Sequence, residues 1–244
     1  MNAVALASQP ANELVRRLPR RADGFSCFKG CVVQLDSSSF SSIAADRRRA
    51  LDLLLARHSP WPLAGPAPSA QELDVVFEAA LRAPDHGQLQ PWRFVVIRGD
   101  ARVALGNVFA QAARLRDPLD GGERFRGKAM AAPVLIAICA RVTAPHKVPE
   151  SEQVLAVGAA AMNMLNALHL LGYGGFWATG ANSHDRHVQQ ALGLLPADRL
   201  LGFLYVGTPK EATRTPDRHA PPSFVREWTG EQGARDIADA DAAR

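Results

Sequence analysis

Three consecutive polar residues, Arg57-His58-Ser59, end the first strongly patterned segment of the chain. An arginine fork beside a serine hydroxyl can bind the oxygens of a phosphate monoester. The alternative is a solvent-exposed helix end, where cationic side chains complement the negative end of the helix dipole. The spacing alone leaves both interpretations open.

Two further segments contain groups that are suited to ligand binding. Residues 82–92 (RAPDHGQLQPW) form a short polar stretch with prolines near both ends. Loops held between rigid elements often carry binding residues. Residues 174–180 (GGFWATG) are rich in glycine, which lets a backbone approach a ligand closely. The alternatives are an ordinary connector for the first segment and a tight bend at a strand end for the second.

We predict neither a metal site nor a dinucleotide-binding fingerprint. Cys27 and Cys31 form a CxxxC pair without a second pair at zinc spacing, and His184 and His187 lack a third ligand. The glycines at 172–175 follow an expected helix, whereas a dinucleotide fingerprint follows a strand.

Expected helices and short strands alternate irregularly along the chain. Ser69-Ala70-Gln71-Glu72 predicts a capping box, while the four prolines of residues 60–68 exclude regular structure there. Because the strands are single runs, the pattern predicts an α+β or α/β fold in which helices cover a sheet. The expected helices are 46–57, 69–82, 100–115, 123–131, 150–171 and 184–192, and the expected buried strands are 92–97 and 134–140, followed by strands 174–178 and 199–207.

Residues 150–171 form the most apolar expected helix, with almost no polar face. A helix that is apolar all round is buried on every side, in a core or in a subunit interface. Gly172 should end this helix as a left-handed cap.

Composition narrows the class of protein. The chain has 244 residues, of which 47% are hydrophobic and 21% charged, as in ordinary globular domains. No apolar run reaches the roughly 18 residues of a membrane span, so we expect no membrane partner. Residues 1–50 carry the whole net charge of +4, and residues 51–244 carry 20 basic and 20 acidic side chains. A neutral body argues against nucleic acid as a partner. Three cysteines imply no disulfide framework and fit the cytoplasm.

The chain divides into three parts by pattern. Residues 1–45 show no persistent period, and we interpret them as a disordered extension or as the product of a start codon placed too far upstream. An organelle-targeting peptide is the alternative, whereas the apolar run of a secretory signal is missing. Residues 46–228 form the expected domain, and residues 229–244 are an expected disordered tail.

Taken together, the three segments resemble the nitroreductase family of FMN oxidoreductases over about residues 46–226. LLLARHS is similar to the family's Arg-[Arg/His]-Ser motif, and RAPDHGQLQPWRFVVI to its Ala-Pro-Ser-x-x-Asn-x-Gln-Pro-Trp loop. LGYGGFWATG is similar to its flavin turn, and FLYVGTP to its last strand. RAPDH in the second motif resembles a small bacterial subgroup.

The resemblance implies a central, mostly antiparallel sheet flanked by helices, in a homodimer with two FMN sites at the interface. Residues 150–171 would be the long, buried interface helix. Arg57 and Ser59 would hold the FMN phosphate, with His58 beside the ribityl chain or the phosphate. The implied flavin contacts from the other subunit are Pro84, Asp85 and His86, and those along the isoalloxazine edge are Trp177, Ala178 and Thr179.

Two positions depart from the family pattern. Many members place a basic residue two positions after the serine, facing flavin N1, where this chain has Trp61. We expect Arg82 to supply that charge, because a cation stabilises the negative charge of reduced flavin. Asp85 and Gln88 replace the usual serine and asparagine.

The implied activity is transfer of a hydride from NAD(P)H through FMN to a nitroaromatic, quinone or enone, by ping-pong kinetics and without a catalytic side chain. The alternative is a flavin-binding carrier or sensor without reductase turnover. A structural dimer without cofactor is disfavoured by Arg57-His58-Ser59 and the glycine turn.

Overall fold

The computed structural model describes residues 37–211, 217–221, 224–225 and 228, with side chains from residue 45 onward. The chain forms two units, Met1–Ala45 and Asp46–Arg244, and the second contains the sheet. Helix α1 (Ser37–Ala56) begins earlier than the predicted start at Asp46. The other predicted boundaries stay predictions, because residues 1–36 and 229–244 lie outside the described residues.

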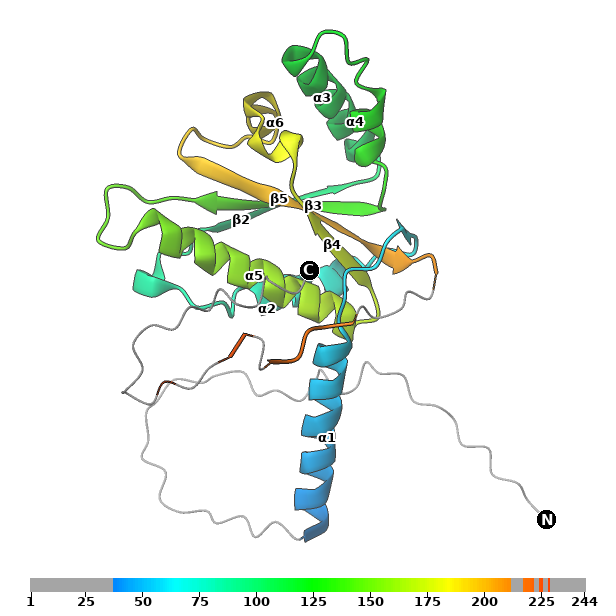
Figure 1. The fold of residues 1–244 in the computed structure, drawn as a ribbon, viewed down its shortest axis with the longest axis vertical. Coiled ribbons are helices and arrows are strands. Elements are labelled where there is room, and N and C mark those ends of the chain that lie inside the picture. Colours follow the sequence, from blue (N-terminus) through cyan, green and yellow to red (C-terminus); the bar gives the residue numbers. More distant parts are fainter. Residues whose placement is uncertain (1–36, 212–216, 222–223, 226–227, 229–244) are drawn as a thin grey trace, which may run out of the picture. The chain divides into compact units, whose positions relative to one another are not determined.

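A five-stranded sheet forms the centre of the second unit (Figure 1). Its order is β1-β5-β3-β2, and β4 also pairs with β5. Every pair is antiparallel, which confirms the predicted α+β class. The strands are β1 (Leu63–Ala64), β2 (Trp92–Arg98), β3 (Val134–Arg141), β4 (Gly174–Ala178) and β5 (Asp198–Pro209).

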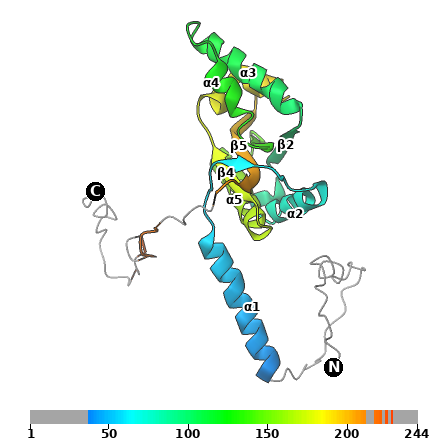
Figure 2. The same ribbon diagram turned by 90° about the vertical axis from the view of Figure 1, so that its right-hand side faces the viewer.

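Helices cover both faces of the sheet (Figure 2). One face packs against α3 (Ala101–Arg116), α4 (Glu123–Lys128) and α6 (Arg186–Ala191), and the other against α2 (Ala70–Ala80) and α5 (Glu150–Leu170). The 3₁₀ turns η3 (His86–Gln88) and η4 (Ala181–His184) connect these elements.

Strand β3 divides the hydrophobic core in two. Its side chains alternate between the faces, with Leu135 in the first cluster and Ile136 in the second, and both are fully buried. The predicted buried strand at 134–140 is therefore confirmed. The prediction that 92–97 is a buried strand is wrong in part, because β2 lies at the sheet edge and only Ile97 is buried along it.

Local signals account for several element ends. Ser69 caps α2 through the predicted box, since its side chain accepts a hydrogen bond from the Glu72 amide and Glu72 accepts one from the Ser69 amide. Gly172 ends α5 with a φ of +86°, as predicted. The exclusion of regular structure from 60–68 is wrong at Leu63–Ala64, which pairs with Thr208 and Pro209.

Within one chain, helix α5 is buried on one side only, so the predicted burial of its other side in a subunit interface stays a prediction. Ala160, Met164 and Leu168 are buried against the sheet and α2. On the outer face, Leu155 is 70% exposed and Leu170 is 55% exposed. Length and composition alone would let α5 span a membrane, but half of its apolar window is buried inside the fold, as in a core helix.

Candidate functional site

Arg57 follows α1 directly and is a half-buried cation. Its Nη1 atom is enclosed and has no hydrogen-bond partner among the described residues. Burial lowers the pKa of Arg57, and the positive charge of Arg218 lowers it further. A partly desolvated cation beside a second cation is unfavourable without a counter-charge, so this position is suited to an anion.

The two residues after Arg57 extend the same segment. His58 is half-buried, and its Nδ1 lies 3.3 Å from the carbonyl oxygen of Ala56. Ser59 is exposed, while Pro60 is buried. The first motif therefore presents a guanidinium and a hydroxyl on a segment that is held in place by the buried Pro60 directly after it.

That anchor joins the first motif to the glycine segment. The Trp61 ring lies 5.2 Å from the Phe176 ring and 5.6 Å from the Tyr205 ring, measured between centroids. A Cβ atom on Gly174 would lie 2.7 Å from Pro60 and 2.6 Å from Leu63, so only glycine allows β4 to approach this segment closely. The structure thus brings the first and third predicted motifs side by side.

Within the third motif, the side chain of Trp177 is occupied by the fold. Its indole Nε1 donates a hydrogen bond to the Leu201 carbonyl at 3.1 Å, and its ring lies against Gly202, which has a φ of +131°. Ala178 is half-buried at the end of β4, and Thr179 is exposed after it. Trp177 therefore fixes the strand end, and the backbone of Ala178 and Thr179 is the part that can face a ligand.

The second motif forms a tightly bonded turn. The Asp85 carboxylate accepts hydrogen bonds from the Leu89 amide at 3.2 Å and the Gln90 amide at 2.7 Å. His86 is exposed, and its Nδ1 lies 2.6 Å from Oε2 of Glu152 on α5. Arg82 and Pro84, at the start of this loop, are both exposed.

This turn lies at the opposite end of the sheet from the first motif. Trp92 pairs with Ala140, which pairs with Arg199 near the start of β5, whereas Gly174 pairs with Gly207 near its end. At about 3.3 Å per strand residue, roughly 25 Å separates these two ends of β5. Within one chain, the residues at 82–86 are therefore far from Arg57, and the structure does not bring all the predicted site residues together.

The sequence profile of the Nitroreductase family matches residues 54–208, more than half of the 244 residues. The chain belongs to the nitroreductase family. The matched range contains all three motifs, whereas Arg218 lies beyond it.

Relatives of known name and structure agree with this membership. The chain is 39% identical over 162 residues to YdjA of Escherichia coli (strain K12), provisionally named an NAD(P)H nitroreductase, covering 66% of this chain and 88% of YdjA. A nitroreductase-like protein from Bacillus cereus superimposes with a TM-score of 0.65 at 19% identity, covering 74% of this chain and 96% of the other. A Desulfovibrio desulfuricans nitroreductase homologue in complex with FMN gives a TM-score of 0.58 at 24% identity, covering 73% and 96%. The predicted nitroreductase-like fold is therefore confirmed.

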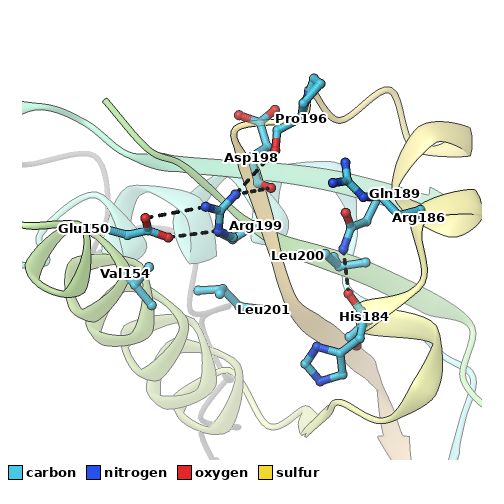
Figure 3. A pocket seen from close by; sticks show the side chains of 11 residues that line it. Glu150, Val154, His184, Arg186, Gln189, Pro196, Asp198, Arg199, Leu200 and Leu201 are labelled. Carbon is cyan, nitrogen blue, oxygen red and sulfur yellow. Dashed lines mark hydrogen bonds and ion pairs between the residues drawn. The ribbon is translucent and has the colours of Figure 1, made fainter. Parts of the chain in front are cut away.

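This nitroreductase-family chain also has a pocket that the sequence did not predict (Figure 3). Its volume is about 400 Å³, and it lies where α5, η4, α6 and the start of β5 meet. Arg199 and Glu150 form an ion pair of 2.9 Å at one side, and His184 lies on another. No residue of the three predicted motifs lines this pocket.

Sequence reasoning missed Glu152 and could not place Arg218. Arg218 lies in a proline-rich tail, where the family resemblance allows a second phosphate contact, but the pattern there is too loose to assign it a position. Glu152 lies in the first turn of α5, where an acidic residue is expected for the helix dipole alone. Neither pairing could be derived from local spacing.

Proposed function

We propose that this chain is an FMN-dependent oxidoreductase that transfers two electrons from NAD(P)H to small organic acceptors such as nitroaromatics, quinones or enones. Membership of the nitroreductase family and the Desulfovibrio homologue in complex with FMN support FMN as the cofactor. The name of YdjA supports NAD(P)H as the electron donor.

The observation that carries the proposal is the unpartnered Nη1 of Arg57. The charge of Arg218 adds to the local positive potential, so a phosphate dianion would satisfy both side chains. Gly174 and Gly175 of the adjoining strand are packed against the chain's own side chains, so the half-buried and exposed backbone from Ala178 to Gly180 is the part left to face a flat ring. The residues present therefore fit the phosphate and the ring of FMN.

Each residue then has a definite task. Arg57 and Ser59 hold the phosphate, with His58 beside it. Trp177 keeps the end of β4 in place through its bond to Leu201, so that the backbone at Ala178 and Thr179 lines the reactive edge of the ring. When bound, FMN supplies the two-electron hydride chemistry, so the protein needs no nucleophile of its own.

The second motif completes this site from another copy of the chain. Residues 84–86 lie roughly 25 Å from the first motif along β5, by the rise of a strand. A homodimer in which Pro84, Asp85 and His86 of one copy meet Arg57 of the other removes this separation. The exposed apolar face of α5, including Leu155 and Met162, supplies an interface to be covered.

Sedimentation of a charged variant tests the dimer. Leu155→Glu should give a monomer that has lost FMN, because a carboxylate would be buried in the apolar interface. Leu119→Glu is the matched control, since Leu119 is 95% exposed on a loop and should leave a yellow dimer. A dimeric, FMN-loaded Leu155→Glu protein would contradict the proposed interface.

Spectroscopy of the purified protein tests the reductase and separates it from a flavin carrier or sensor. A reductase should bleach on addition of NADH or NADPH and recover its colour with a quinone. A carrier should stay yellow. A protein that is colourless and does not bind added FMN would overturn the proposal as a whole.

Steady-state kinetics test the use of one pocket by both substrates. If the donor leaves before the acceptor enters, double-reciprocal plots at several acceptor concentrations should be parallel. Intersecting lines would contradict the shared pocket. Such a reaction draws on cytoplasmic NAD(P)H, so the proposed location is the cytoplasm.

A further inference from the structure

The contact between His86 and Glu152 joins two segments 66 residues apart. Nδ1 of His86 lies 2.6 Å from Oε2 of Glu152, while the two side chains are 64% and 45% exposed. The other ring nitrogen, Nε2, has no hydrogen bond to any described residue. One nitrogen of His86 is thus fixed by a carboxylate, and the other is left for an outside partner.

The turn that carries His86 is held in an unusual conformation. Gln88 and Gln90 have φ values of 53° and 49°, in the left-handed region that non-glycine residues rarely adopt. The Asp85 carboxylate maintains this backbone by accepting two amide hydrogen bonds. Backbone strain of this kind concentrates at functional sites, where it fixes a side chain in position.

The backbone that carries Glu152 is held in place by the fold. It lies in the first turn of α5, and its neighbour Gln153 is buried and clamps the preceding loop. Gln153 accepts a hydrogen bond from the Thr143 amide and donates to the carbonyl oxygens of Thr143 and Val148. Because an exposed polar contact of this kind contributes little to stability, folding alone does not explain why His86 and Glu152 meet across two separate elements.

We propose that His86 is the proton donor for the acceptor's reduction and that Glu152 is its positioning residue. This inference rests on the proposed function, in which the turn of one copy faces the flavin of the other. A histidine whose Nδ1–H is held by a carboxylate presents Nε2–H outward when it is protonated. This arrangement is suited to general-acid catalysis.

The chemistry balances for a quinone acceptor. The quinone gains a hydride, which carries two electrons, from the reduced cofactor. The Nε2–H bond of His86 breaks, an O–H bond forms on the quinone, and hydroquinone results. The neutral imidazole then takes a proton from water. Glu152 keeps its charge throughout, because it only orients the ring.

The first test measures the imidazole itself, in protein freed of FMN. With ¹⁵N-labelled histidine, NMR should show the proton of neutral His86 on Nδ1, as the contact with Glu152 requires. Glu152→Gln should abolish this preference. Glu150→Gln is the matched control. It removes a charge from the same helical turn, but Glu150 pairs with Arg199 and not with His86. An unchanged tautomer in Glu152→Gln would refute the positioning role.

The second test separates the two half-reactions by stopped flow. In His86→Ala, reoxidation by a quinone should slow by about 10² to 10⁴, and by far more than reduction by NADPH slows. Added imidazole should restore the rate of reoxidation, which a merely structural role would not allow. Reoxidation that is no more impaired than reduction, or that imidazole does not restore, would refute the role of His86 as proton donor but not the proposed function. Failure of the native protein to bind FMN would instead refute the proposed function.

Discussion

Replacing Arg57 with methionine should leave the stability of the FMN-free protein unchanged or raised, while it lowers the affinity for FMN. In the empty protein, the guanidinium is half-buried, its Nη1 is unpartnered, and Arg218 disfavours its charge. Methionine keeps most of the apolar stem and removes this desolvated cation. The free energy of unfolding of FMN-free protein should therefore stay within about 0.5 kcal/mol of the native value or exceed it.

The affinity for FMN should fall in the same variant. A hydrogen bond from a charged donor contributes about 1.5–3 kcal/mol, and Arg57 would donate to phosphate oxygens. Since 1.4 kcal/mol corresponds to a factor of ten, the dissociation constant should rise about 10- to 150-fold. Added salt should reduce the difference in FMN affinity between native and Arg57→Met protein only slightly, because Arg57 is half-buried and its charge is poorly screened.

Two measurements on the same preparations test whether Arg57 binds the phosphate of FMN or only supports the fold. Urea unfolding of FMN-free protein gives the stability, and quenching of FMN fluorescence gives the affinity. Arg98→Met is the matched control, because Arg98 lies exposed at the end of β2 and should change neither quantity. Loss of stability in the empty protein with unchanged FMN affinity would show that Arg57 is a structural residue, and the phosphate site would have to be sought elsewhere.

Three further variants test other parts of the reasoning. Arg82→Leu should lower the flavin reduction potential, and an unchanged potential would exclude Arg82 as the charge facing N1. Asp198→Asn should reduce the free energy of unfolding by at most about 2 kcal/mol at neutral pH. Hydrogen bonds from Arg141 hold the pKa of Asp198 below its usual value. Unfolding measured at several pH values should therefore show the stability difference between native and variant protein disappear as pH falls through that depressed pKa. Gly202→Ala should reduce the free energy of unfolding by about 2–4 kcal/mol in denaturant unfolding, since φ is +131° and a Cβ would lie 2.6 Å from a backbone oxygen of β4. The control Gly127→Ala should not reduce it, because a Cβ there would meet open space.

The sequence predicted those elements whose cause is local. The capping box at Ser69 and the left-handed glycine at 172 involve neighbours only, and both are present. The eight-residue strand β3 is apolar at almost every position because both of its faces are covered, so its burial could be read directly.

Features that depend on distant partners were not predictable in the same way. Leu63–Ala64 has no strand pattern and pairs only because the end of β5 passes beside it. Val96 at the exposed edge of β2 is as apolar as a buried strand residue, so composition could not reveal which side lacks a neighbour. The motif resemblance named Arg57 and His86, but their surroundings, Arg218 and Glu152, come from tertiary structure.

The length of the sheet has a thermodynamic consequence for the proposed dimer. In that dimer, each copy would hold the phosphate end of one site and the loop end of the other, so a twofold axis would complete both sites at once. FMN would then contact groups from two chains. The free energy by which bound FMN stabilises the dimer would equal the free energy by which dimer formation strengthens FMN binding. Substitutions at Leu155 and at Arg57, on different elements, should therefore both weaken the dimer at limiting FMN. Only Leu155 substitutions should do so when FMN is absent, because Arg57 acts on the assembly solely through the cofactor.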